Sequence, residues 1–170
     1  SWGGTPVEAW TSEEALKDFP KHINEKRLYE DSGYRDRIKQ IEGENFHLWN
    51  TTLHAADPGM QEDGKWYEED YDDRTWPQTD MFSKDWGNDG LNPQGGSHWL
   101  RKDVQIPGKW AGKEAVIRLG CIVDADSVYV NGRFVGTTGY QYPPRIYRIP
   151  AGVLKAGANN LTVRVISNGG

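Results

Sequence analysis

The stretch "DSVYVNGRFVG" constrains the fold more than any other part of the sequence. Asn131 and Gly132 stand between two runs rich in β-branched and aromatic residues, and this dipeptide favours the two positive-φ positions of a type I′ turn. Val128 and Val130 lie on one face of the strand before the turn, because side chains alternate along a strand. The pattern predicts a tight antiparallel hairpin.

Four other segments carry strand patterns bounded by glycine and proline: "SHWLRKDVQIP", "EAVIRLGCIV", "PRIYRIP" and "NLTVRVIS". Several short strands at regular spacing favour an antiparallel β-sandwich, and the lack of a helical pattern after residue 65 argues against a parallel sheet. Leu161, Val163 and Val165 form one face of the last strand. We expect that face to point into the core of the sandwich.

The chain before Asp57 has helical patterns instead. Thr11 and Glu14 have the spacing of a capping box that opens a short helix, "SEEALKDF", and Pro20 is expected to end it. The stretch "YRDRIKQIEGENFHLWNTTLHAA" predicts a second, amphipathic helix, which "DPGMQEDG" ends. The sequence therefore divides into a helical segment at 11–56 and a sandwich at 57–170.

Charge and cysteine content exclude several classes of function. The formal net charge is −5 and the basic residues are scattered, so nucleic acid is not an expected partner. No apolar run is long enough to span a membrane, and we expect no membrane partner. Cys121 is the one cysteine, which rules out an internal disulfide and a cysteine-based zinc site. Its apolar surroundings predict a buried thiol.

No catalytic constellation stands out among the candidate residues. The sequence has four histidines and no serine in a G-x-S-x-G context. Ser97 and His98 are neighbours on a predicted strand, so their side chains point to opposite faces and cannot form a dyad. We therefore expect this chain alone to lack hydrolytic activity.

No metal or cofactor is expected either. The acidic run "EEDYDDRTW" does not match an EF-hand loop, and we interpret it as a solvated turn with Trp76 anchored in the core. Asp124 and Asp126 in "DADS" are expected to cap the entry to a strand or to hydrogen-bond a loop. A structural calcium ion is the alternative there.

The aromatic residues suggest a binding surface. Eight tryptophans and eight tyrosines are many for so polar a chain, and they could form a core, a sugar-stacking surface or both. Trp86 in "SKDWGNDGLN" and the pair Tyr140 and Tyr142 in "GYQYPPR" are the rings most available to a ligand. Arg145, beside that pair, could hydrogen-bond a carboxylate or two hydroxyl groups. These four residues are the substrate-binding candidates.

A family resemblance rests on "DDRTW", "HWLRKDVQIP" and "VDADSVYVNGRFVGTTGYQYPPRIYRIPAGVLKAGANNLTVRV". These segments resemble the galactose-binding-like jelly-roll domain of glycoside hydrolase family 2. They resemble more closely the insert domain of the sialate O-acetylesterase family. The resemblance covers most of residues 65–170 and implies a mainly β fold, an antiparallel jelly-roll β-sandwich that follows a helical segment.

The first ten residues, "SWGGTPVEAW", are similar to a catalytic-domain loop of those esterases. The resemblance implies that residues 1–10 are a remnant of an SGNH-type hydrolase domain, and that Gly3 and Gly4 belong to its oxyanion loop. The nucleophilic serine segment and the histidine segment of the family are not in this sequence. The implied partners are the missing SGNH-type catalytic domain of the same parent chain and an acetylated carbohydrate, in a secreted or periplasmic protein.

Three functions remain open for the chain. It could be an accessory sandwich that shapes or flanks the substrate cleft of a carbohydrate O-acetylesterase acting on sialate-type or xylan-type sugars. It could be an independent carbohydrate-binding module. It could also be a structural spacer without a ligand, because a fold alone does not establish a function.

Overall fold

The computed structural model describes residues 12–79 and 95–167 of the chain. The chain divides into two compact units, Ser1–Thr52 and Leu53–Gly170. Helices characterise the first unit and antiparallel sheets the second. The predicted fold class, an antiparallel β-sandwich preceded by a helical segment, is confirmed.

The helical segment has three described helices: α2 (Glu13–Leu16), α3 (Pro20–Glu30) and α4 (Ser32–Ala56). The long helix α4 corresponds to the predicted amphipathic helix and continues a few residues into the second unit. None of the three helices contains a buried residue. The described residues of this segment are therefore weakly packed.

Two details of the helical prediction are wrong. The N-cap of α2 is Ser12, whose hydroxyl accepts a hydrogen bond from the amide of Ala15 at 3.2 Å, whereas Thr11 lies outside the described residues. Pro20 does not simply end a helix, since α3 begins at this residue. The fixed φ of proline and its missing N–H suit the first position of a helix, where no intrahelical donor is needed.

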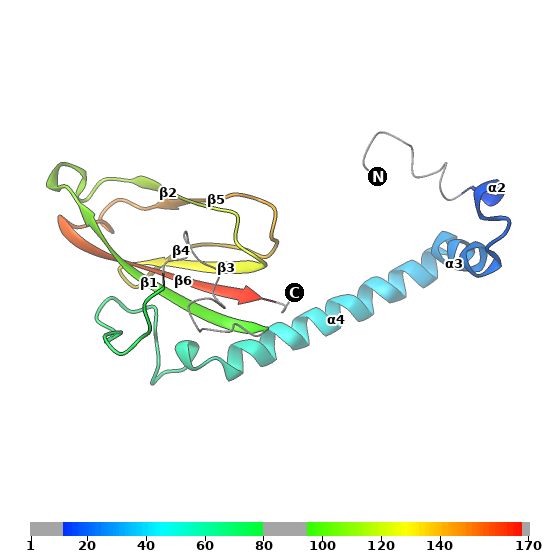
Figure 1. Ribbon diagram of the computed structural model, residues 1–170, viewed down its shortest axis with the longest axis horizontal. Helices are drawn as coiled ribbons and strands as arrows, with labels where there is room; N and C mark the ends of the chain where they lie inside the picture. Colours follow the sequence, from blue (N-terminus) through cyan, green and yellow to red (C-terminus); the bar gives the residue numbers. More distant parts are fainter. Residues whose placement is uncertain (1–11, 80–94, 168–170) are drawn as a thin grey trace. The chain divides into compact units, whose positions relative to one another are not determined.

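The described residues of the second unit form two antiparallel sheets, which lie face to face in Figure 1. The larger sheet has the strand order β1-β6-β3-β4, and the smaller one pairs β2 with β5. The strands are β1 (Gly96–Ile106), β2 (Ala115–Gly120), β3 (Ala125–Val130), β4 (Arg133–Thr138), β5 (Arg145–Ile149) and β6 (Gly157–Ser167). The described parts of the connections include the short 3-10 helices η1 (Pro58–Met60) and η3 (Gly108–Trp110).

The hairpin that the sequence predicted joins β3 to β4. Asn131 and Gly132 have φ values of 50° and 76°, as a type I′ turn requires. The Asn131 side chain also ties the turn to its surroundings, because its amide donates to Val153 O and to Asn159 Oδ1, both at 2.8 Å. Local turn chemistry and tertiary contacts thus favour the same hairpin.

The core lies between the two sheets and consists of two apolar clusters. Their buried members are Val128, Tyr147, Val163 and Val165 in one, and Val130, Ile149, Val153 and Leu154 in the other. Leu161 is partly buried and packs against both clusters, so the predicted core face of β6 is confirmed. Burial of one such aliphatic side chain contributes about 1.5–3 kcal/mol.

The opposite face of the larger sheet is covered by aromatic residues that precede β1. The Trp66 ring packs edge to face against the rings of Trp99 in β1 and of Trp76. The distances between ring centroids are 6.0 and 5.2 Å, respectively. Tyr67 stacks on Tyr129 of β3 with ring centroids 4.8 Å apart. Trp76 therefore anchors the acidic run on this outer face, and the prediction that it lies in the core is wrong.

The prediction for Cys121 is wrong, because the thiol is exposed. Strand β2 ends at Gly120, whose φ of 71° breaks the extended backbone. The apolar run that suggested burial therefore continues past the end of the strand. The Cys121 sulfur lies 3.2 Å from Tyr142 O, to which it donates a hydrogen bond.

Candidate functional site

Two buried arginine–aspartate pairs organise the polar parts of the sandwich. Arg164 donates through Nε to Asp57 at 2.6 Å, and Arg145 donates through Nε to Asp126 at 2.5 Å. The first pair holds the segment that covers the outer face of the larger sheet. The second lies beneath the exposed tyrosines that the sequence singled out.

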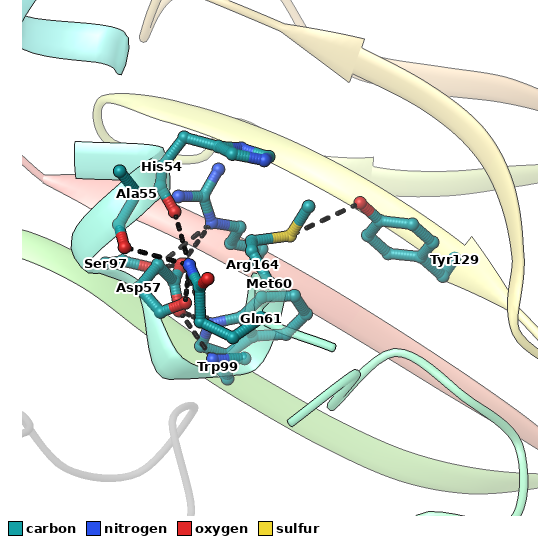
Figure 2. A network of polar contacts seen from close by, with 10 residues as sticks. His54, Ala55, Asp57, Met60, Gln61, Ser97, Trp99, Tyr129 and Arg164 are labelled. Carbon is teal, nitrogen blue, oxygen red and sulfur yellow. Dashed lines mark hydrogen bonds and ion pairs between the residues drawn. The ribbon is translucent and has the colours of Figure 1, made fainter. Parts of the chain in front are cut away.

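The Asp57 carboxylate is the centre of the first network, which Figure 2 shows. Its Oδ2 accepts from Ser97 Oγ at 2.5 Å and from Arg164 Nε at 2.6 Å, while its Oδ1 accepts from Trp99 Nε1 at 2.9 Å. Strand register explains this convergence. Ser97 and Trp99 share one face of β1, and Trp99 lies opposite Arg164 of β6.

The network also shapes the end of α4. Asp57 Oδ1 accepts from the amide of Gly59 at 2.9 Å, which caps η1. Gln61 Nε2 donates to the carbonyls of Ala55, His54 and Asp57 at 2.9 to 3.3 Å (Figure 2). Carbonyls in the last turn of a helix lack intrahelical partners, so Gln61 satisfies them.

The first network lacks the properties of a catalytic site. Burial raises the pKa of Asp57, but the hydrogen bonds from Ser97, Trp99 and Arg164 together bring it below its ordinary value. A carboxylate so stabilised in its charged form is a weak base. Ser97 is therefore not activated as a nucleophile, and the network serves the fold.

The second network lies at one end of the sandwich. Asp126 is 1% exposed and accepts from Arg145 through Oδ1 and from the Tyr147 hydroxyl through Oδ2, at 2.5 and 2.6 Å. Burial and the hydrogen bond to Asp126 raise the pKa of Tyr147 to about 12. The Tyr147 hydroxyl also contacts Thr138 Oγ1 at 2.8 Å, so the network links three strands.

Above this network is a loop at residues 139–144, which we call the aromatic loop. Tyr140 and Tyr142 are 59% and 67% exposed, and their rings meet edge to face with centroids 5.1 Å apart. The carbonyls of Gln141 and Pro143, on either side of Tyr142, accept hydrogen bonds from Arg145. The loop thus presents two rings outward from a backbone that is held from below.

The four candidate substrate-binding residues comprise an exposed pair, one buried residue and one residue outside the described part of the chain. The structure brings Tyr140 and Tyr142 together as an exposed pair. The role proposed for Arg145 is wrong: its side chain is 0% exposed, and its donors are used by Asp126 and by backbone carbonyls. Trp86, and Gly3 and Gly4 of the oxyanion-loop hypothesis, lie outside the described residues.

Asp57, Arg164 and Tyr147 were missed as organising residues. A charged residue within an apolar strand, such as Arg164 in "LTVRVIS", signals a buried partner, because unpaired charges are rarely buried. Asp126 is expected from the sequence to cap a strand entry or to hydrogen-bond a loop, but its carboxylate instead accepts from the Arg145 and Tyr147 side chains of β5. The calcium alternative is not supported at Asp126, whose carboxylate is occupied by that pair.

Metal and membrane features are lacking within the part of the chain that the structure describes. No group of three or more potential ligands could hold a metal ion among those residues. None of the described helices is long and apolar enough to cross a membrane.

No protein-family model matches the chain, and no curated protein matches it. Among solved structures, it is similar to Ruminococcus gnavus β-glucuronidase in complex with uronic isofagomine, at 22% identity over 44% of this chain and 12% of that one, with a TM-score of 0.41. For that enzyme in complex with D-glucuronic acid, identity is 20% over 54% and 16% of the two chains, with a TM-score of 0.42.

The chain thus spans far less than two thirds of the solved chains that it matches. Similarity this low carries no argument about function. The esterase family that the sequence motifs suggest stays a prediction.

Proposed function

We propose that this chain is a non-catalytic, carbohydrate-related accessory domain whose aromatic loop contacts a sugar. The observation that carries the proposal is the exposed, edge-to-face pair of Tyr140 and Tyr142. Sugar rings present C–H faces that pack on aromatic rings, while hydroxyl groups at the rim are fixed by polar partners. Two tyrosines, each with an apolar ring and a hydroxyl group, supply both kinds of contact.

The finer proposal places the sandwich in a carbohydrate O-acetylesterase, where it shapes or flanks the substrate cleft. It is supported by the sequence resemblance of the sandwich and of "SWGGTPVEAW" to the sialate O-acetylesterase family. The partner is then an SGNH-type catalytic domain of the same parent chain, the ligand is an acetylated carbohydrate, and the protein is secreted or periplasmic. The chemistry of the ester belongs to that catalytic domain.

Titration with sugars tests the aromatic loop directly. Sialosides and galactosides, acetylated and plain, and xylo-oligosaccharides are added to the protein while amide chemical shifts are followed. We expect saturable binding with a dissociation constant on the order of millimolar, as for a single small site. Tyr142→Ala should abolish it. Trp110→Ala is the matched control, because Trp110 is a similarly exposed ring (53%) on η3.

The titration also separates the alternatives. No saturable shift with any sugar at high millimolar concentration would favour the structural spacer. Binding that survives Tyr142→Ala but not Trp110→Ala would show that the wrong surface was chosen. Release of nitrophenol from a chromogenic acetate by the purified chain, lost in Ser97→Ala, would contradict the non-catalytic assignment.

A further inference from the structure

The buried guanidinium of Arg145 donates to two backbone carbonyls of the aromatic loop. We propose that Arg145 is the positioning residue of this loop: it holds Tyr140 and Tyr142 in a binding-ready arrangement without touching the ligand. The part of this inference that concerns sugar binding rests on the proposed function. Its structural content, an ordered loop that depends on Arg145, can be tested without any ligand.

The hydrogen bonds of Arg145 match its five N–H groups. Nε donates to Asp126 Oδ1 at 2.5 Å, Nη1 to Pro143 O at 2.6 Å and Gln141 O at 3.3 Å, and Nη2 to Ile122 O at 2.6 Å and Asp124 O at 3.1 Å. A guanidinium carries five donors in a fixed plane. All of them have acceptors here: one N–H pairs with Asp126 of β3, and the other four join two loops.

The two loops that it joins are the aromatic loop and residues 121–124. The Gln141 and Pro143 carbonyls bracket Tyr142, so their shared donor fixes the backbone from which that ring projects. Cys121 adds a contact between the same loops through its hydrogen bond to Tyr142 O at 3.2 Å. The exposed rings therefore stand on a base tied at several points.

The base is in turn fixed to the core. Asp126 Oδ2 accepts a hydrogen bond from the Tyr147 hydroxyl at 2.6 Å. The Tyr147 ring packs so closely on Gly136 that a Cβ atom added at Gly136 would lie 2.2 Å from the ring. Neither Arg145 nor Asp126 has any exposed side-chain surface. The guanidinium position is therefore set by the core, and the loop position by the guanidinium.

Lysine cannot replace this geometry. Its ammonium group is a point charge that can keep the pair with Asp126, but it cannot reach four carbonyls on both sides at once. A loop released from its base would lose order, and a ligand would then have to restore that order on binding. Arg145→Lys should therefore weaken sugar binding although the substituted side chain never meets the sugar.

Arg164→Lys is the matched control. Arg164 is also a buried arginine that donates through Nε to an aspartate, at nearly the same distance, but it belongs to the Asp57 network. A general loss of stability should affect both variants. Loosening of the aromatic loop should affect only Arg145→Lys.

The experiment combines backbone relaxation by nitrogen-15 NMR with the sugar titration described above. We expect order parameters of about 0.85 for the Gln141 and Tyr142 amides in the wild type and in Arg164→Lys, and values below about 0.6 in Arg145→Lys. The dissociation constant should rise about tenfold in Arg145→Lys, the change expected for loss of charge-assisted hydrogen bonds. It should stay unchanged in Arg164→Lys.

Each outcome decides the inference. Wild-type order parameters below about 0.6 in the loop would overturn it even if Arg145→Lys does not fold. Unchanged loop order and affinity in a folded Arg145→Lys, or equal losses in both variants, would also overturn it. If the wild type binds none of the sugars, the proposed function fails, and the NMR comparison alone decides whether Arg145 positions the loop.

Discussion

Removal of the Asp57 carboxylate should destabilise the sandwich far more than removal of an exposed aspartate. In Asp57→Ala, Arg164 keeps its charge in a position only 7% exposed, and Ser97 and Trp99 lose their acceptor. Arg164 Nη2 is already buried without a hydrogen-bond partner among the described residues. The Asp57 carboxylate is therefore the main compensation for this buried charge.

The magnitude follows from the unpaired charge. Breaking a buried ion pair from one side costs about 3–5 kcal/mol, a large share of the roughly 5–15 kcal/mol that stabilises a typical domain. For a unit the size of Leu53–Gly170, this corresponds to a fall in melting temperature of about 10–25 °C. Thermal unfolding followed by circular dichroism measures it, with Asp72→Ala, which breaks an exposed pair with Arg74, as the control without effect.

A double variant checks the reasoning. Asp57→Leu combined with Arg164→Met removes both charges, and well-packed apolar replacements of a buried pair are often nearly neutral. The double variant should therefore melt above Asp57→Ala. Two results would refute the idea that the two buried charges compensate each other. One is a loss of less than about 1 kcal/mol of unfolding free energy in Asp57→Ala. The other is a double variant with a lower melting temperature than Asp57→Ala.

The pH dependence has a definite sign. The folded-state pKa of Asp57 lies below its ordinary value of 3.8, so its contribution to stability is fully present above that value. The contribution is lost as the pH falls through the lowered, folded-state pKa. Asp57→Asn should remove this acid-dependent part of the unfolding free energy and flatten the stability curve below pH 3.8.

Two further predictions concern the second network. Gly136→Ala places a Cβ atom 2.2 Å from the Tyr147 ring and should cost about 1–3 kcal/mol in thermal unfolding through overpacking, whereas Gly139→Ala meets no atom within 4 Å and should be tolerated. Tyr147, with a pKa of about 12, should ionise after ordinary tyrosines in an ultraviolet titration. Its stabilising effect is present below about pH 10 and is lost as the pH rises towards 12, and Tyr147→Phe should lack this alkaline loss. Loss of the alkaline step in a Tyr140→Phe variant instead would contradict the assignment.

The local parts of the fold could be predicted because their causes are local. Asn131 and Gly132 need only their own backbone preferences to form the turn, and alternation alone places Val163 and Val165 on one face. Helix α3 was missed because Pro20 was interpreted as a terminator, although proline is equally suited to the first helical position. Proline is thus compatible with the end of one helix and with the start of the next, and only the residues around it distinguish the two cases.

For Arg145, the sequence contained the information that its side chain is buried, but the residue was misinterpreted. It begins β5, and the strand alternates so that Arg145, Tyr147 and Ile149 are buried together. That alternation was visible in "RIYRI" and would have placed the guanidinium inward. Arg145 directly follows the loop-forming tyrosines and prolines of "GYQYPP", and this neighbourhood alone would place it on the surface.

The two arginine–aspartate pairs explain why the rest could not be predicted. Buried ion pairs are weak evidence for stability, since apolar residues of similar volume can replace them, but they require one particular geometry. Arg164 and Asp57 are 107 positions apart in the chain, and their pairing fixes the start of the segment before β1 on the outer face. Arg145 and Asp126 are only 19 apart, and their pairing specifies where two loops meet. In both cases the local pattern can indicate a buried arginine, but it does not identify the aspartate that pairs with it, so the pairing itself could not be predicted.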